Sequence, residues 1–281
     1  MTPAEAVVLG LFWSVILLAC LLLRLTLPAR AAVPTPPDAE PISFQATDGV
    51  WLSGWQLASD LQHPWVILCH SAGRHRGELF SLAQRLATAH FNCLLFDFRA
   101  HGQSHGRTVA YGWREHHDLQ GALAWLGKQA DIPDRPFGIV GRELGAFVAL
   151  TVAATDDRLY AIVAESPPRS AIEVMALRIR ATYRIPRLLG HPLAAMFSRL
   201  RFGRPPASIS KLSTQLAERV ILLIHHAAHD PHERVTRSLV PPAIVWETGL
   251  DKERSTAGHQ AYAKQVIGFL RQHLQESRRR R

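Results

Sequence analysis

The chain has 281 residues, 47% of them apolar and 20% charged, so it can bury one sizeable core and is too apolar to be disordered. Its three cysteines cannot build a disulfide framework or a cysteine-only zinc site. The formal net charge of +9 includes four terminal arginines, and the remaining +5 does not indicate a nucleic-acid partner. The arginine tail is expected to be solvated or to be weakly attracted to anionic lipid headgroups.

The N-terminal segment predicts a membrane anchor within residues 1–30. Eighteen consecutive residues from Ala6 to Leu23 carry no charge, and a helix of that length spans about 27 Å of hydrocarbon. The alternative is a cleaved signal peptide, with Ala29-Arg30-Ala31 as the cleavage site. Residues 1–5 hold no lysine or arginine and the apolar run is longer than usual for a signal peptide, which favours a retained anchor in the lipid bilayer.

The residues after this run predict orientation and a spacer. Arg24 and Arg30 flank the apolar run on its C-terminal side, so the positive-inside bias predicts a single-pass protein whose folded body is cytoplasmic. Residues 31–41 hold four prolines, which is typical of an extended linker that lifts a domain from the membrane. The folded domain is expected over residues 42–275, followed by a basic tail at 276–281.

The first folded elements are a hairpin and a βαβ unit. Residues 42–46 and 50–57 alternate in the manner of strands and are joined by a Thr-Asp-Gly turn, which predicts an antiparallel hairpin. Residues 65–70 and 92–97 are apolar throughout, as strands covered on both faces require. Between them, apolar residues recur with helical spacing over 79–86.

The same alternation continues along the chain and predicts an α/β fold with a mostly parallel central sheet and helices on both faces. The regular pattern lapses between two of the strands, at residues 168–212, where arginines are interspersed among leucines; this stretch is expected to form an inserted helical cap. The further elements expected are helices at 119–126 and 144–154, strands at 137–140, 159–164, 220–224 and 243–247, and a last helix with Tyr262, Val266, Phe269 and Leu270 on one stripe.

The turn at residues 141–145 carries the main functional signal. A strand runs directly into Gly-Arg-Glu-Leu-Gly and then into a helix, which is the context of a nucleophile elbow. The glycines allow a sharp turn, and the helix N-terminus directs N–H groups toward the middle residue. That residue is Glu143, where the usual G-x-S-x-G pattern has serine. Taken alone, these five residues also fit an ordinary glycine-rich loop.

Together with this turn, four other segments make the sequence resemble the α/β-hydrolase superfamily over residues 42–274. The similarity is greatest to its membrane-anchored bacterial members of serine aminopeptidase-like and esterase-like type. Residues 94–104 are similar to the family's D-x-R-G-x-G-x-S loop and are the most specific match. The other matching segments are 69–73, 112–118 and 164–167.

The resemblance implies a catalytic triad in the order nucleophile, acid, histidine. Glu143 occupies the nucleophile position. Asp230 is the candidate acid in a loop similar to the family's H-G-x-x-D, although His229 occupies the strict position of the acid because the loop is one residue longer. His259 is the candidate base, in a Gly-His pair before the last helix.

The resemblance also implies an oxyanion hole. The backbone N–H groups of Leu144 and Ala72 are the expected donors, within a pocket to which His70 and Ser71 also contribute. Ser71 stands where the family pattern has glycine.

The fifteen histidines raise the question of a metal site. Those that cluster near a carboxylate are His225, His226, His229 and His232. No H-x-x-x-H helix or paired cysteine supports metal binding, so we expect neither a metal nor a cofactor.

A glutamate at the elbow has no hydroxyl proton to give up, so an ordinary acyl-enzyme cycle is blocked. Three hypotheses follow. The first is a protein of the ester and amide hydrolase lineage that has lost serine catalysis and binds a small acyl-type ligand or a protein partner. The second is a hydrolase that uses Glu143 as nucleophile or as base for water. The third is a hydrolase with a displaced serine, Ser71 or Ser166.

Overall fold

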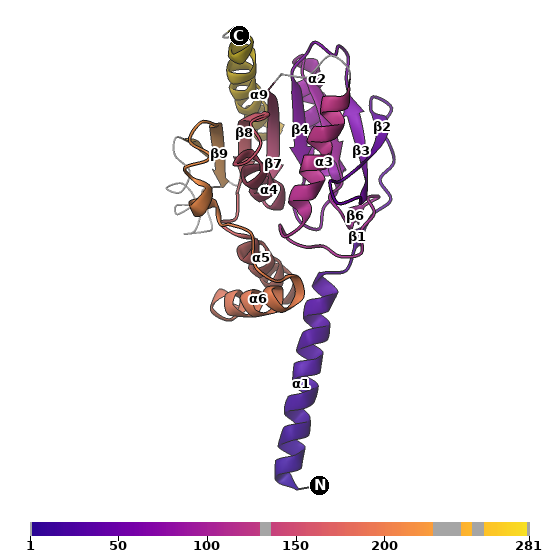
Figure 1. Cartoon of the computed structure of the whole chain (residues 1–281), viewed down its shortest axis with the longest axis vertical. Helices are drawn as coiled ribbons and strands as arrows, with labels where there is room; N and C mark the ends of the chain where they lie inside the picture. Colours follow the sequence, from indigo (N-terminus) through magenta and orange to yellow (C-terminus); the bar gives the residue numbers. More distant parts are fainter. Residues whose placement is uncertain (1, 130–135, 227–242, 249–255, 280–281) are drawn as a thin grey trace.

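The computed structural model describes residues 2–129, 136–226, 243–248 and 256–279. Within these ranges, the main sheet has eight strands in the order β10-β9-β8-β7-β4-β5-β3-β2 (Figure 1). Neighbours from β10 to β5 are parallel, whereas β3 is antiparallel to both β5 and β2. The strands are β2 (Glu40–Gln45), β3 (Trp51–Leu57), β4 (Trp65–Cys69), β5 (Asn92–Phe96), β7 (Phe137–Arg142), β8 (Leu159–Glu165), β9 (Val220–His226) and β10 (Ile244–Thr248).

Helices cover both faces of this sheet, as the alternating pattern predicts. Helices α2 and α9 pack on one face with one apolar cluster, and α3 and α4 pack on the other face with a second cluster. The helices are α1 (Pro3–Leu25), α2 (Phe80–Thr88), α3 (Glu115–Lys128), α4 (Leu144–Ala153), α5 (Ala171–Tyr183), α6 (Arg187–Phe202) and α9 (Thr256–Arg279), with short 3-10 turns η1 (Arg76–Leu79) and η2 (Ile209–Leu212). The predicted α/β class is confirmed.

The local predictions hold for physical reasons visible in the structure. All five residues of β4 are buried, as its unbroken apolar run requires. The hairpin of β2 and β3 turns at Gly49, whose φ of 86° is accessible to glycine at little cost. In α9, the stripe from Tyr262 to Leu270 faces the core.

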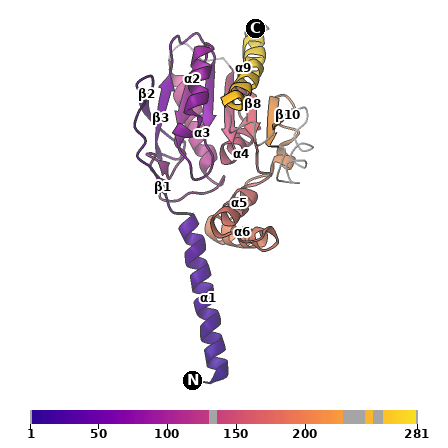
Figure 2. The same ribbon diagram turned by 180° about the vertical axis from the view of Figure 1, so that it is seen from behind.

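Helix α1 is long and apolar enough to cross a membrane, and it projects from one end of the body (Figures 1 and 2). The segment that follows it makes backbone hydrogen bonds to the body. Residues Ala29–Arg30 form β1, which pairs in parallel with β6 (His101–Gly102). The N–H of Ala29 donates to the carbonyl of Ala100 at 2.7 Å, and Val33 is buried. The start of the linker is therefore docked on the body.

The predicted insert contains α5, α6 and η2. Helices α5 and α6 pack together at the end of the body from which α1 leaves, beneath the carboxyl ends of the parallel strands (Figures 1 and 2). Arg184, with a φ of 56°, ends α5 in the left-handed conformation and lets the chain turn into α6. The cap thus lies over the edge of the sheet that carries the elbow and the loop after β4.

Candidate functional site at the elbow after β7

The turn between β7 and α4 has the strained geometry of a nucleophile elbow. Glu143 adopts φ 43° and ψ −105°, a conformation that costs a non-glycine residue of order 1–3 kcal/mol. The residues two positions before and two positions after it must be glycine. A Cβ on Gly145 would lie 2.2 Å from the carbonyl oxygen of Cys69, and one on Gly141 would lie 2.5 Å from the nitrogen of Ala146. The chain therefore keeps the elbow although the serine is absent.

The loop after β4 forms the opposite wall of the site. The backbone N–H of Ser71 donates to Glu78 Oε2 at 2.7 Å, and the Ser71 hydroxyl donates to Glu78 Oε1 at 3.1 Å. The N–H of Gly73 donates to Nε2 of His101 at 3.0 Å. Glu78 and His101 thus fix this loop from both sides.

His70 is buried behind the loop and holds it in place. Its Nε2 accepts from the N–H of Phe98 at 3.0 Å, so its proton is on Nδ1, which donates to the carbonyl of Ser71 at 2.8 Å. Burial lowers the pKa of His70 to about 4. Burial, together with the neighbouring His70, also lowers the pKa of His101. Both imidazoles are therefore neutral near pH 7, as their hydrogen bonds require.

The two expected oxyanion donors lie in this arrangement. Leu144 begins α4, where N–H groups have no intrahelical partner, and Ala72 follows Ser71 in the loop. Among the described residues, neither backbone N–H has a hydrogen-bond partner. Both remain available to a ligand oxygen.

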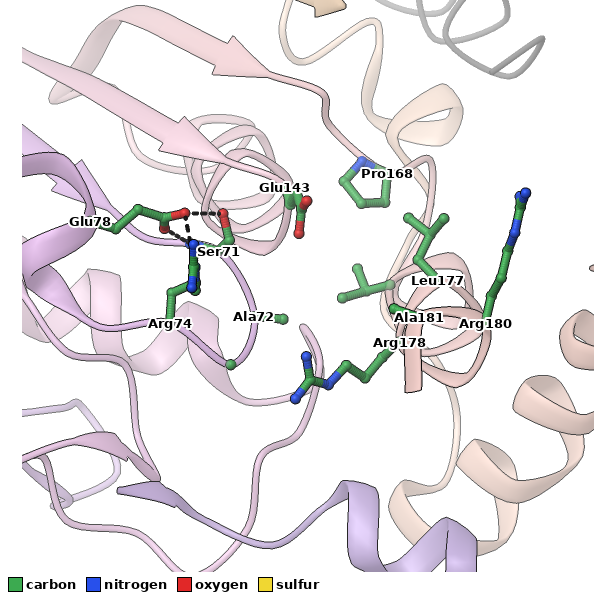
Figure 3. A pocket seen from close by; sticks show the side chains of 12 residues that line it. Ser71, Ala72, Arg74, Glu78, Glu143, Pro168, Leu177, Arg178, Arg180 and Ala181 are labelled. Atoms are coloured by element: carbon green, nitrogen blue, oxygen red, sulfur yellow. Dashed lines mark hydrogen bonds and ion pairs between the residues drawn. The ribbon is translucent and has the colours of Figure 1, made fainter. Parts of the chain in front are cut away.

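A cavity of about 790 Å³ lies between the elbow and the cap, within the size range of small-molecule sites. Glu143 opens into it from the elbow, Ser71 and Glu78 lie on one side, and Arg178 reaches in from α5 (Figure 3). Leu177 and Val174 give the cap side of the cavity an apolar surface. The cavity therefore combines apolar walls with charged groups of both signs.

The charge on Glu143 is disfavoured by its surroundings. Its side chain is open to the cavity but is surrounded by protein, and this desolvation raises its pKa. The charges of Glu78 and Glu165 raise the pKa further, while Arg142 and Arg74 oppose the shift. A carboxyl with a raised pKa can take up a proton more readily and then donate a hydrogen bond.

His259 lies in the first turn of α9, is exposed, and is not among the residues that line the cavity. One turn further, Tyr262 donates to Glu165 Oε2 at 2.7 Å, and Arg142 Nε donates to the same oxygen at 2.7 Å. These contacts place the start of α9 beside the elbow. Asp230 lies outside the described residues, so the pairing of His259 with Asp230 stays a prediction.

The alternative serines have different surroundings. The Ser71 hydroxyl is bonded to a carboxylate of Glu78 rather than to a histidine. Ser166 follows β8 with a φ of 47°, and its N–H donates to the carbonyl of Ile224 at 2.9 Å. Neither serine occupies the elbow.

The histidine-rich segment lies partly outside the described residues, which exclude His229 and His232. His225 is buried at the end of β9. Within the part of the chain that the structure describes, no group of three or more metal-ligating side chains forms.

No role for Glu78, His101 or Arg178 follows from the sequence pattern. His101 lies in the loop at residues 94–104, the segment most similar to the family pattern, so the sequence did point to this loop as part of the site. Nothing in the local pattern distinguishes Glu78 or Arg178 from other surface charges, because their roles depend on contacts made across the fold.

Comparisons with known proteins agree with this architecture. The profile of the family described as alpha/beta hydrolase fold matches residues 64–197. YqkD of Bacillus subtilis, a protein described as uncharacterized, is 28% identical over 232 residues, which cover 79% of this chain and 76% of that protein. Rv2307c of Mycobacterium tuberculosis, also described as uncharacterized, is 30% identical over 152 residues, 53% of each chain.

Solved structures show the same fold. An esterase of Pyrococcus furiosus superposes with a TM-score of 0.69 and 21% identity, covering 89% of this chain and 98% of the esterase. A bottromycin epimerase superposes with a TM-score of 0.54 and 18% identity, covering 82% of this chain and 98% of that protein. Since an esterase and an epimerase share the architecture, the likeness shows the fold alone. Strand order, elbow and family profile agree: the chain has the α/β-hydrolase fold, and its residues 64–197 match the profile of that family.

Proposed function

We propose that this protein is a membrane-anchored member of the ester and amide hydrolase lineage that binds a small acyl-type ligand and has lost serine catalysis. The observation that carries the proposal is Glu143, whose carboxyl group stands at the tip of the elbow and opens into the cavity. A serine hydrolase needs a hydroxyl at this point, and a glutamate cannot form the acyl-enzyme.

The remaining parts of the site suit binding. The backbone N–H groups of Leu144 and Ala72 can donate to a carbonyl or carboxylate oxygen of a ligand, since they have no partner among the described residues. The raised pKa of Glu143 favours its protonated form, which can donate to the same ligand. The apolar walls formed by Leu177 and Val174 suit an acyl chain.

The anchor part of the proposal rests on α1. Its last turn is built into the body: Leu22 and Leu25 are buried, and Tyr111 donates to the carbonyl of Leu25 at 2.5 Å. A leader that is cleaved off would leave these partners without contacts, so the packing supports a retained helix. Arg24 and Arg30, on the C-terminal side of the span, support a body on the cytoplasmic side.

The test uses the full chain in lipid nanodiscs with two readouts. A series of p-nitrophenyl esters from acetate to dodecanoate measures turnover, and a dansyl-labelled fatty acid measures binding. We expect saturable binding without turnover above buffer. Leu177→Asp should weaken binding, whereas Leu61→Asp, an exposed leucine in the loop before β4, should not. Absence of binding in the wild type would overturn the proposal.

The second candidate is a hydrolase in which Glu143 itself acts. The raised pKa of Glu143 favours it, because a general base works best when its pKa approaches the working pH. In the same assay, ester turnover by wild type that disappears in Glu143→Gln would establish this function and overturn the proposal of a binding protein without catalysis.

A further inference from the structure

A second cavity adjoins the first one where α1 meets the body. It has a volume of about 470 Å³ and is lined by Arg24 and Leu25 of α1, Tyr111 of the body and Thr182 and Tyr183 of the cap. Gly73 and Arg178 line both this junction cavity and the cavity at Glu143. The two spaces therefore share a boundary at the guanidinium of Arg178.

The junction cavity has a fixed relation to the end of α1. Tyr183 of the cap donates to the carbonyl of Leu21 at 2.6 Å, and Tyr111 of the body donates to the carbonyl of Leu25 at 2.5 Å. The N–H of Val109 donates to the carbonyl of Thr26 at 3.0 Å. If α1 spans a bilayer, Arg24 marks its headgroup region, and the junction cavity lies at that level.

The cap carries a second membrane feature on the same side of the molecule. Leu189, Met196 and Leu200 of α6 are exposed at a spacing of seven and four residues, which places them on one helix face. Exposed arginines accompany them at positions 184, 199, 201 and 204. Apolar side chains with flanking arginines suit a helix lying in the headgroup region of a bilayer. Figures 1 and 2 show α6 beside the body end of α1.

Arg178 is positioned to hold an anion between the two cavities. Its guanidinium lies so close to Gly73 that a Cβ there would be 2.9 Å from Nη2. Within the described residues, Arg178 has no acidic partner. A guanidinium without a carboxylate partner, facing a cavity, suits a carboxylate or phosphate group of a ligand.

We propose that α6 rests on the lipid headgroups beside α1 and that the site at Glu143 is filled from the bilayer, through the junction cavity, by a single-chain amphiphile whose anionic head binds Arg178. The proposal rests on the proposed function, since it names the ligand class and its route to the same site. The apolar wall at Leu177 and Val174 receives the acyl chain. A fatty acid and a lysophospholipid share this chemistry.

The contact of α6 with lipid is tested in the full chain in phosphatidylcholine and phosphatidylglycerol nanodiscs. The exposed Cys20 is replaced by alanine, and a fluorophore is attached at Leu200→Cys or, as a control, at Leu61→Cys. Residue 61 precedes β4 and lies at the opposite end of the sheet. We expect lipids with a spin label near the headgroup to quench the probe at position 200 and not at 61. Equal fluorescence at position 200 with and without spin-labelled lipid would overturn the contact.

The route and the ligand are tested with a photoreactive fatty acid dissolved in the nanodisc lipid. Wild type should be labelled within the site, and Arg178→Gln should lower labelling about tenfold because a charge-assisted hydrogen bond is lost. Arg271→Gln, which removes an exposed arginine of α9 that lines neither cavity, should label as wild type. Thr182→Trp fills only the junction cavity, so it should slow labelling from lipid while leaving the binding of dissolved hexanoate unchanged.

The outcomes separate the route from the function. Hexanoate binding with unchanged labelling in Thr182→Trp would overturn the route but keep the binding site. Absence of both hexanoate binding and labelling in wild type would overturn the proposed function itself. Competition by oleate alone, or by lysophosphatidate alone, identifies which anionic head is held; equal competition by neutral monooleoylglycerol would overturn the assignment of an anion to Arg178.

Discussion

The backbone N–H of Gly73 donates to Nε2 of His101 at 3.0 Å and thereby joins the loop after β4 to the loop after β5. Gly73 has a φ of 75°, and His101 is fully buried with its Nδ1 bonded to the carbonyl of Arg99 at 2.9 Å. A neutral imidazole is therefore the element that fixes the wall of the cavity opposite the elbow. The β1 strand, which follows α1, pairs with the same His101 segment, so this segment supports both the site and the chain that leads out of α1.

Removing this imidazole should loosen the site. His101→Ala leaves the half-buried Gly73 N–H without its imidazole partner, which should lower the free energy of unfolding by about 0.5–1.5 kcal/mol and weaken binding of the acyl probe. His101→Gln keeps an acceptor and should recover part of both. Urea unfolding and fluorescence titration measure the two effects; an alanine variant with wild-type values for both would show that the bond is dispensable.

The buried histidines should make the fold sensitive to acid. The pKa of His70 falls from its ordinary 6.5 to about 4 in the folded state, so between these values the unfolded chain binds the extra proton. Stability should therefore fall as the pH drops from about 6.5 to 4, by at most about 1.4 kcal/mol per pH unit for each such histidine. Urea unfolding at several pH values measures the slope, and a flat profile for wild type across this window would contradict the prediction.

Glu143 should make the stability of the fold depend on pH in the direction opposite to that of the buried histidines. Its pKa is raised in the folded state, so the folded chain retains the proton above the ordinary range of a glutamate, and stability falls as the pH rises through that range. Glu143→Gln removes the cost of ionising this desolvated carboxyl and should raise the melting temperature at pH 7. The difference in melting temperature between variant and wild type should shrink toward pH 4. Differential scanning fluorimetry tests this, with Glu40→Gln as a control on an exposed strand position. A lower melting temperature for Glu143→Gln at pH 7 would contradict it.

Restoring the serine tests how much of the catalytic apparatus remains. The elbow conformation is present, and the N–H groups of Leu144 and Ala72 have no partner in the described part of the chain. Glu143→Ser should therefore react with a fluorophosphonate probe, whereas wild type should not. A gain of about 10²-fold in the rate of ester hydrolysis would correspond to about 2.7 kcal/mol of transition-state stabilisation. Adding His259→Ala should abolish the gain. An unreactive serine variant would mean that the base does not reach the elbow.

Glycine at position 145 should be indispensable to the elbow. A Cβ there would lie 2.2 Å from the carbonyl oxygen of Cys69, a backbone atom that cannot move without shifting β4. Gly145→Ala should therefore destabilise the fold by about 1–3 kcal/mol or more. The matched change Gly268→Ala in α9 meets nothing within 4 Å and should stabilise the helix by about 1 kcal/mol. Thermal unfolding compares the two, and an equal effect of both would refute the steric argument.

Local sequence determined the elements and the position of the elbow. The unbroken apolar run at 65–69 and the helical stripes in α2 and α9 identify their elements, because periodicity reports which faces are covered. Likewise, the two glycines around Glu143 predict the turn, since only glycine fits those close backbone approaches. These features depend on residues near one another in the chain.

Only the tertiary structure decided how α1, the cap and the elbow meet. Tyr183 contacts Leu21 across 162 positions of sequence, and Arg178 comes to rest against Gly73. No periodicity encodes such contacts, because they arise when the sheet brings distant loops to its carboxyl edge. For the same reason the start of the linker, predicted from its prolines to be extended, lies against the His101 loop: the N–H of Ala31 donates to the carbonyl of Gly102 at 3.2 Å, a contact that composition does not reveal.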